Sequence, residues 1–259
     1  MSVFVRPVQA IGRVALQSVV AIGRSGYLAI EAVHALRKVE LWGPHLLTQM
    51  GRIGVESVPI ALFIAMFTGI VLALQASYTF TGAVPLYFVG TLVGKTMVLE
   101  LGPVLTGLAL AGRVGANIAA ELGSMRVTEQ IDALETLAYD PVAYLVVPRV
   151  LAGALMFPVV VVLANAVGIV AGWGTAQALL DMSSQEFIRG LRIFFEPWDV
   201  QFSMIKSVSF GIVVTGVGCS FGYHARGGAE GVGMATTRAV VIATMIILAL
   251  DAFWAYTLL

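Results

Sequence analysis

Long apolar runs dominate the pattern of hydrophobic and polar positions along the chain. They extend over residues 58–74, 151–180, 210–221 and 239–259. Each run meets or approaches the roughly 20 residues that a helix needs to cross a bilayer. The runs are continuously apolar, whereas the strands of a membrane β-barrel alternate between apolar and polar positions over about ten residues. The pattern therefore predicts an all-α, polytopic membrane protein.

Polar segments divide the apolar runs into five predicted transmembrane helices. These begin near residues 56, 86, 148, 202 and 239, and a short external turn at 81–85 separates the first two. Apolar residues recur at helical spacing over about 183–196, which predicts an amphipathic helix on the external surface. The glycine-rich stretch at 222–240 predicts a flexible cytoplasmic loop before the last span.

The N-terminal segment, residues 2–24, combines an apolar stripe with arginines at helical spacing. Arg13 interrupts the continuous apolar region that a signal peptide requires. We expect an amphipathic helix in the membrane interface, its arginines toward anionic headgroups. A helix packed on the protein's own spans, without a lipid role, fits the pattern equally well. The predicted organisation is an N-terminal region over 1–53, in which 25–53 form a cytoplasmic elbow, and a transmembrane domain over 54–259.

Composition agrees with a membrane protein, because 59% of the residues are hydrophobic and 12% are charged, too few charges to cover a soluble domain. The formal net charge of zero conceals an asymmetry. If the first span leaves the cytoplasm, most arginines fall on the cytoplasmic side, and Arg189 and Arg192 fall opposite. The positive-inside rule then places the N-terminus in the cytoplasm and the C-terminus outside. The lone Cys219 excludes a disulfide within the chain.

Carboxylates inside apolar spans are the candidate functional residues. An ionised carboxylate at membrane depth costs several kcal/mol unless it is paired or hydrated, so Glu100 in the second span predicts an internal cavity. A structural pair with Lys95 is the competing explanation, although a spacing of five residues is poor for contact along a helix. Asp251 in the last span precedes Trp254 and Tyr256, which are typical interface residues, so helix packing and a substrate role fit it equally.

The segment over about 121–138 is amphipathic and acidic. Its apolar residues lie broadly on one side, and Glu121, Glu129, Asp132 and Glu135 decorate the rest. Because anionic lipid repels acidic residues, the charges favour a protein partner in the cytoplasm over an interfacial helix.

Several enzyme classes are excluded by missing motifs. The glycine-rich stretch lacks the preceding strand and the Lys-Ser/Thr pair of a phosphate-binding loop. The chain shows no Walker motif, nucleophile elbow, His-Glu-x-x-His helix or paired-cysteine metal site. We therefore expect no enzymatic activity, cofactor or metal in this chain, and no nucleic-acid partner. If ATP drives the protein, another subunit must supply the ATPase.

The motifs as a set resemble the MlaE/YrbE permease family, the membrane subunits of MCE-associated ABC transporters that move phospholipids or other lipids. The matching motifs are Glu100-Leu-Gly-Pro103, Ala111-Gly-Arg-Val-Gly115, Ala120-Glu-Leu-Gly123, Thr128-Glu-Gln-Ile-Asp-Ala-Leu134, Asp140-Pro141 and Ala235-Thr-Thr-Arg238. The resemblance covers most of the chain from about residue 55 onward.

The resemblance implies a complex in the bacterial inner membrane. It comprises a homodimer of the permease, two cytoplasmic ABC ATPases that bind ATP and magnesium, MCE-domain proteins on the periplasmic face and, in some systems, a STAS-domain subunit. It also implies that 121–138 is the coupling helix that docks on the ATPase. The expected coupling residues are Glu121, Met125, Arg126, Glu129, Gln130, Asp132, Leu134 and Glu135.

The resemblance further implies a lipid cavity at the dimer axis, lined by the first, second and fifth spans. Glu100 falls at the family's acidic position; some relatives carry an arginine directly before it, where this chain has Leu99, and Lys95 would supply the nearby positive charge. The expected cavity residues are Ile70, Leu74, Gln75, Lys95, Val98, Leu99, Glu100 and Asp251.

Two other function classes stay open at this point. One is an ion-coupled secondary transporter that uses Glu100 and Asp251 as ion sites, although the chain lacks the repeated broken helices of such folds. The other is an integral-membrane lipid enzyme, for which the sequence offers no recognisable nucleophile or metal set.

Overall fold

The computed structural model describes residues 19–20, 23–79, 85–180 and 182–258, and within these ranges it contains helices and no strand. Five helices are long and apolar enough to cross a membrane: Val39–Thr79, Tyr87–Val127, Val142–Leu179, Pro197–Tyr223 and Gly228–Leu258. The prediction of an all-α, polytopic membrane protein is therefore confirmed. The expected interfacial helix at 2–24 lies mostly outside the described residues.

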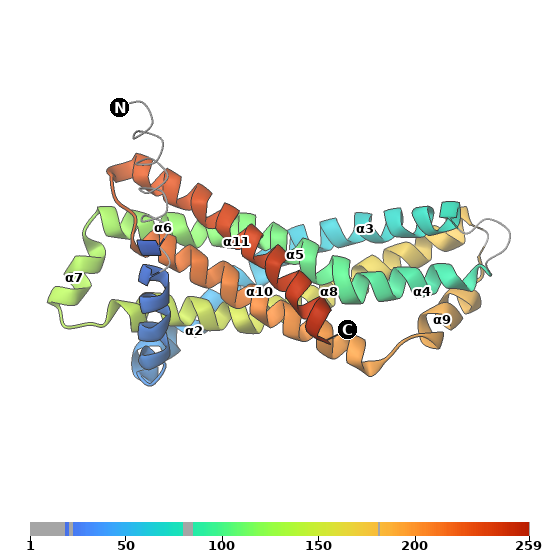
Figure 1. Ribbon diagram of the computed structural model, residues 1–259, viewed down its shortest axis with the longest axis horizontal. Helices are drawn as coiled ribbons and strands as arrows, with labels where there is room; N and C mark the ends of the chain where they lie inside the picture. The colour runs from blue at the N-terminus through green and yellow to red at the C-terminus, as the bar shows by residue number, and fades with distance from the viewer. Residues whose placement is uncertain (1–18, 21–22, 80–84, 181, 259) are drawn as a thin grey trace, which may run out of the picture.

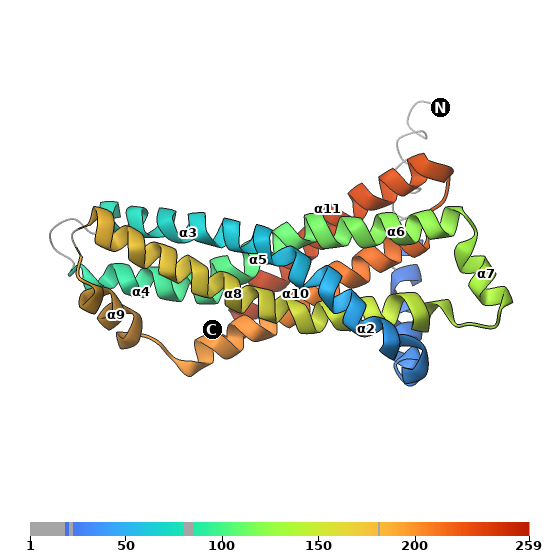
Figure 2. The ribbon, with the colours of Figure 1, turned by 180° about the vertical axis from the view of Figure 1, so that it is seen from behind.

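The first span is preceded by an oblique helix. Helix α2 (Val39–Ile53) leads through a 3₁₀ turn (Val55–Ser57) into α3 (Val58–Thr79). Figure 2 shows α2 running at an angle into α3. Arg52 lies in the last turn of α2 and Glu56 in the 3₁₀ turn, so the uninterrupted apolar sequence begins with α3, which is the membrane-spanning part.

The second span is a continuous helix with two wide turns. It consists of α4 (Tyr87–Thr96), a π-turn (Met97–Leu101), α5 (Gly102–Leu110), a second π-turn (Ala111–Gly115) and α6 (Ala116–Val127). The first π-turn lies directly before the Gly-Pro pair, where proline cannot donate an α-helical hydrogen bond. Glu100 lies in this turn.

The remaining helices complete the bundle. A π-turn (Val142–Val146) opens α8 (Val147–Leu179), followed by α9 (Ser184–Ile193), α10 (Pro197–Tyr223) and α11 (Gly228–Leu258). The amphipathic helix expected over about 183–196 is present as α9, and Ser183 and Glu186 form a capping box at its start.

The predicted glycine-rich loop is wrong in extent, because α11 already begins at Gly228. Positive φ angles at Gly227 and Gly228 make the turn into this helix. A side chain on Gly231 would lie 1.8 Å from the Arg226 carbonyl, so glycine permits this close approach. The glycines thus serve a tight turn and a close contact rather than a flexible loop.

The bundle is elongated, and its two ends differ. In both views α6 and α7 (Gln130–Thr136) lie at one end with the N-terminal helices, and α9 lies at the other (Figures 1 and 2). Helices α3 and α8 cross closely at Gly69, where a Cβ atom would lie 1.9 Å from the Gly168 carbonyl oxygen. The absence of a side chain at Gly69 thus permits this close helix crossing.

Asp140 stabilises the start of the third span. Its Oδ1 accepts hydrogen bonds from the backbone N–H groups of Val142 at 3.0 Å and Ala143 at 3.2 Å, and its Oδ2 accepts one from Lys38 Nζ at 2.8 Å. Burial by itself raises the pKa of Asp140, but the Lys38 ammonium and the two N–H groups outweigh it and hold the pKa below its ordinary value.

Asp140→Asn keeps an acceptor for the two N–H groups but loses the ion pair with Lys38, so it should destabilise the protein at pH 7 by less than about 1 kcal/mol. A carboxyl whose folded-state pKa is depressed stabilises the fold above its unfolded pKa and loses that effect as pH falls through the folded pKa. The difference in melting temperature between variant and parent should therefore narrow below pH 3.8, the ordinary pKa of this group. Glu40→Gln, at an exposed acid of α2, serves as the control, and a gap that is constant with pH would contradict the assignment.

Candidate functional site

Three charged side chains from three spans meet inside the bundle, and we call them the charge cluster: Glu100, Lys206 and Asp251. Lys206 of α10 is fully buried. Its Nζ lies 2.7 Å from Glu100 Oε2 of the second span and 2.5 Å from Asp251 Oδ1 of α11. The contact with Glu100 is a hydrogen bond, whereas that with Asp251 is an ion pair whose angles fall outside hydrogen-bond geometry. One cation thus joins the second, fourth and fifth spans.

The local sequence leaves a backbone carbonyl that can accept a further hydrogen bond from Lys206. Pro103 has no N–H, so it cannot donate the α-helical hydrogen bond to the carbonyl of Leu99. Lys206 Nζ donates to this carbonyl at 3.1 Å. The Gly102-Pro103 pair therefore does more than widen the helix, since it turns a backbone carbonyl into part of the cluster.

The two carboxylates differ in access. Asp251 is buried, with 9% of the residue exposed, whereas the side chain of Glu100 is 44% exposed. Two carboxylates and one ammonium carry a net charge of −1 when all three are ionised. Lys206 is thus the counter-ion of the cluster, and Glu100 is the member that a ligand can reach.

The structure brings together only part of the expected lipid cavity. Leu99, Glu100 and Asp251 all contact Lys206. The suggested pair of Lys95 with Glu100 is wrong, because Lys95 Nζ lies 3.6 Å from Asp199 Oδ2 at the start of α10.

The other expected cavity residues lie elsewhere. Leu74 and Gln75 are exposed on α3, Ile70 on the same helix is half-buried, and Val98 lines a separate crevice with Lys95. Among the described residues, no hydrogen bond or ion pair joins them to the charge cluster.

Sequence reasoning missed Lys206 as a member of the site. A signal was present, since a lysine in an apolar span needs a partner as much as a carboxylate does. The pairing itself joins residues 106 positions apart, and spacing along the chain carries no information about it.

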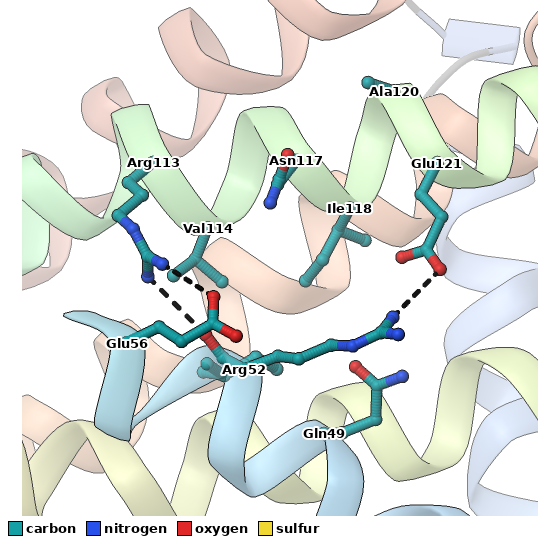
Figure 3. A pocket seen from close by; sticks show the side chains of 10 residues that line it. Gln49, Arg52, Glu56, Arg113, Val114, Asn117, Ile118, Ala120 and Glu121 are labelled. Atoms are coloured by element: carbon teal, nitrogen blue, oxygen red, sulfur yellow. Dashed lines mark hydrogen bonds and ion pairs between the residues drawn. The ribbon is translucent and has the colours of Figure 1, made fainter.

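A second site lies between α2 and the second span, near the end of the bundle that holds α6 and α7. It is a cleft of about 360 Å³, and Figure 3 shows Arg113, Asn117 and Glu121 along one side with Arg52 and Glu56 on the other. Arg113 pairs with Glu56 at 3.0 Å, and Arg52 pairs with Glu121 at 3.4 Å. These two ion pairs cross the cleft and connect α2 and the 3₁₀ turn after it to the second span.

The expected coupling helix at 121–138 is divided in two. Helix α6 ends at Val127, and Glu129 adopts a left-handed backbone with φ of 59° before α7 begins at Gln130. Arg126 of α6 pairs with Asp132 of α7 at 2.5 Å across the break. The segment is therefore a helix end, a turn and a short second helix.

The expected coupling residues separate into inward and outward groups. Glu121 pairs with Arg52 and with buried Arg149, and Met125 and Leu134 pack against the core. The outward group consists of Glu129, Gln130 and Glu135, together with the exposed apolar residues Leu137 and Tyr139. We call these five residues the α7 surface.

Comparisons with known proteins assign a family. The family described as "Permease MlaE" matches residues 46–257. A "Probable ABC transporter permease protein" of Rickettsia bellii is 37% identical over 92% of both chains, and one of Synechocystis is 42% identical over 78% of this chain and 76% of the relative. The "Intermembrane phospholipid transport system permease protein MlaE" of Haemophilus influenzae is 34% identical over 94% of both chains.

Proposed function

The chain belongs to the MlaE permease family and is an ABC transporter permease subunit, and we propose that it moves phospholipid between the inner membrane and an external MCE-domain partner. The observation that carries the proposal is the charge cluster, in which buried Lys206 holds a partly exposed Glu100 inside apolar helices. An oriented carboxylate beside apolar walls suits an amphiphile, because the headgroup meets the charge and the acyl chains meet the walls.

A second copy of the chain would complete the cavity. The exposed apolar residues of α3, including Leu74, would then face the dimer axis with Ile70, and burial of acyl chains there contributes about 0.8 kcal/mol per methylene. Gln75, also exposed on α3, would meet the headgroup together with Glu100. We propose both the homodimer and these headgroup contacts.

Energy would enter at the opposite end of the bundle. We assign ATP and magnesium to a separate cytoplasmic ATPase that binds the α7 surface, and a STAS-domain subunit can accompany it. The second span supports this assignment, since it is helical without a break from Tyr87 to Val127 and passes through Glu100. A push on α7 would thus act on the cavity wall. The arginines near α6 favour a cytoplasmic position for this end, which puts the N-terminus inside and the C-terminus in the periplasm.

An ion-coupled mechanism finds less support. Glu100 and Asp251 share the single cation Lys206, which occupies the position between them. The family assignment to ABC permeases also favours coupling to ATP hydrolysis in a partner.

Glu100→Gln tests the proposed role of the charge cluster. The substitution keeps the size of the side chain, and Asp251 remains to balance Lys206, so the fold should persist. Loss of one charged hydrogen bond to a headgroup should lower the phospholipid retained by the purified complex about tenfold, with a matching fall in lipid-stimulated ATPase activity.

The matched control is Glu230→Gln, which removes an exposed acid in the first turn of α11. It should leave both quantities unchanged. If Glu100→Gln also leaves retained lipid and ATPase stimulation at the level of the parent, Glu100 has no part in lipid transfer.

A further inference from the structure

A second cavity lies at the opposite end of the bundle from the α7 surface, and we call it the external crevice. Its walls come from the second span, α8, α9 and the start of α10, and its volume is about 300 Å³. None of its lining residues comes from the first or fifth span. It is therefore distinct from a cavity that the first, second and fifth spans would line at a dimer axis.

The walls of the external crevice are apolar. Val98 of the second span, Ile169 of α8 and Leu191 and Phe195 of the α9 region line it. The volume falls at the lower end of the range for small-molecule sites, and such sites are mostly apolar with a few placed polar groups. A hydrocarbon chain fits these walls, whereas a polar solute would find few partners in the interior.

The charged residues of the external crevice favour an anion. Lys95 and Asp199 form an ion pair at 3.6 Å, and Asp199 also accepts the Glu196 backbone N–H as part of a helix cap. The Asp199 side chain is nearly buried, so it is already committed to these contacts. Arg192 is exposed and has no ion-pair partner among the residues that the structure describes. The crevice therefore carries one uncompensated positive charge.

The surroundings of the external crevice resemble a membrane interface. Phe195 lines it, and its sequence neighbours Phe194, at the end of α9, and Trp198, in the first turn of α10, are also exposed. Aromatic residues gather at the level of lipid headgroups, where one side of the ring is apolar and the other is wet. An arginine at this level can reach a phosphate while the crevice takes the chain below it.

We propose that the external crevice binds an anionic phospholipid of the leaflet next to α9, with one acyl chain between Val98, Ile169 and Leu191 and the phosphate at Arg192. In the proposed orientation this is the outer leaflet of the inner membrane. Binding here needs neither ATP nor the charge cluster, so the site stands or falls independently of the transport function.

The test uses the purified complex in nanodiscs of phosphatidylcholine that contain phosphatidylglycerol with a photoactivatable acyl chain. Mass spectrometry after irradiation should find the label on peptides from α9 and from the second span around Val98. Arg192→Gln should lower this labelling about fivefold, the effect of one basic residue near an anionic surface. Ile169→Trp should abolish it, because the indole fills the space of the chain.

Arg189→Gln is the matched control, since Arg189 lies on the same helix but packs over the Tyr87 ring at 5.5 Å and does not line the crevice. It should leave labelling unchanged. If Arg189→Gln and Arg192→Gln lower the labelling equally, the effect comes from general surface charge and not from a site at Arg192. Equal labelling by a photoactivatable phosphatidylcholine, or labelling that survives Ile169→Trp, would overturn the proposal.

Discussion

Replacing Lys206 with methionine should lower the free energy of unfolding by about 3–5 kcal/mol, the cost of breaking a buried ion pair from one side. The substitution leaves Asp251 buried without a counter-charge and removes the partner of Glu100. It also withdraws the donor from the Leu99 carbonyl. The purified variant should therefore show a much lower melting temperature in detergent and should fail to retain phospholipid.

Two further variants separate charge from packing at Lys206. Lys38→Met makes the same chemical change at an exposed pair with Asp140, where loss of the ion pair should cost less than about 1 kcal/mol. Adding Asp251→Asn to Lys206→Met removes the uncompensated buried charge and should recover a large part of the stability. A Lys206→Met protein as stable as the parent would show that the cluster does not hold the spans together.

Leu137→Glu should separate the permease from the ATPase proposed to bind the α7 surface. Leu137 is 68% exposed at the tip of the α7 surface, beside Tyr139. An exposed apolar residue of this size suits the centre of a protein interface, where loss of a central contact costs about 2 kcal/mol or more, roughly a 30-fold fall in affinity. Co-purification of the ATPase with the tagged permease should therefore fail, although the isolated variant should keep the melting temperature of the parent.

Leu137→Met is the control for this prediction, because it keeps an apolar side chain of similar size. It should retain the ATPase and ATP-driven lipid transfer. If the ATPase co-purifies fully with Leu137→Glu, the α7 surface is excluded as the docking site. The cleft lined by Arg52 and Arg113 would then be the next candidate.

The number and type of the spans could be predicted from the sequence because each crossing needs a long apolar run, a constraint that acts locally. The amphipathic helix α9 could be predicted in the same way, from the spacing of its apolar residues. In the glycine-rich stretch the prediction failed, since a helix from Gly228 is stabilised by packing that composition does not reveal.

The break before α7 has no clear signal in the sequence. A left-handed backbone is usual for glycine or asparagine, yet here it occurs at Glu129. The pairing of Arg126 with Asp132 and the packing of buried Ile131 fix the turn through contacts across it. Sequence periodicity therefore gave a single amphipathic helix, and tertiary contacts divide it.

The two carboxylates of the charge cluster could be identified from the sequence, but their cation could not. Glu100 and Asp251 stand out because a carboxylate in an apolar span demands a partner. Proximity in the sequence suggested Lys95 as the partner of Glu100. Lys95 instead pairs with Asp199, and Lys206 from another span pairs with Glu100. Which cation meets which carboxylate depends on how the spans pack, and this can be read only from the folded chain.

The most direct test of the account is lipid transfer by the complex purified with its native neighbours and reconstituted in proteoliposomes. A fluorescent phospholipid in the bilayer and the soluble external partner report transfer, and the reaction is run with ATP, without ATP and with an ionophore that collapses ion gradients. Transfer should require ATP and should persist with the ionophore. Transfer that proceeds without ATP and stops when the ion gradients collapse would contradict it.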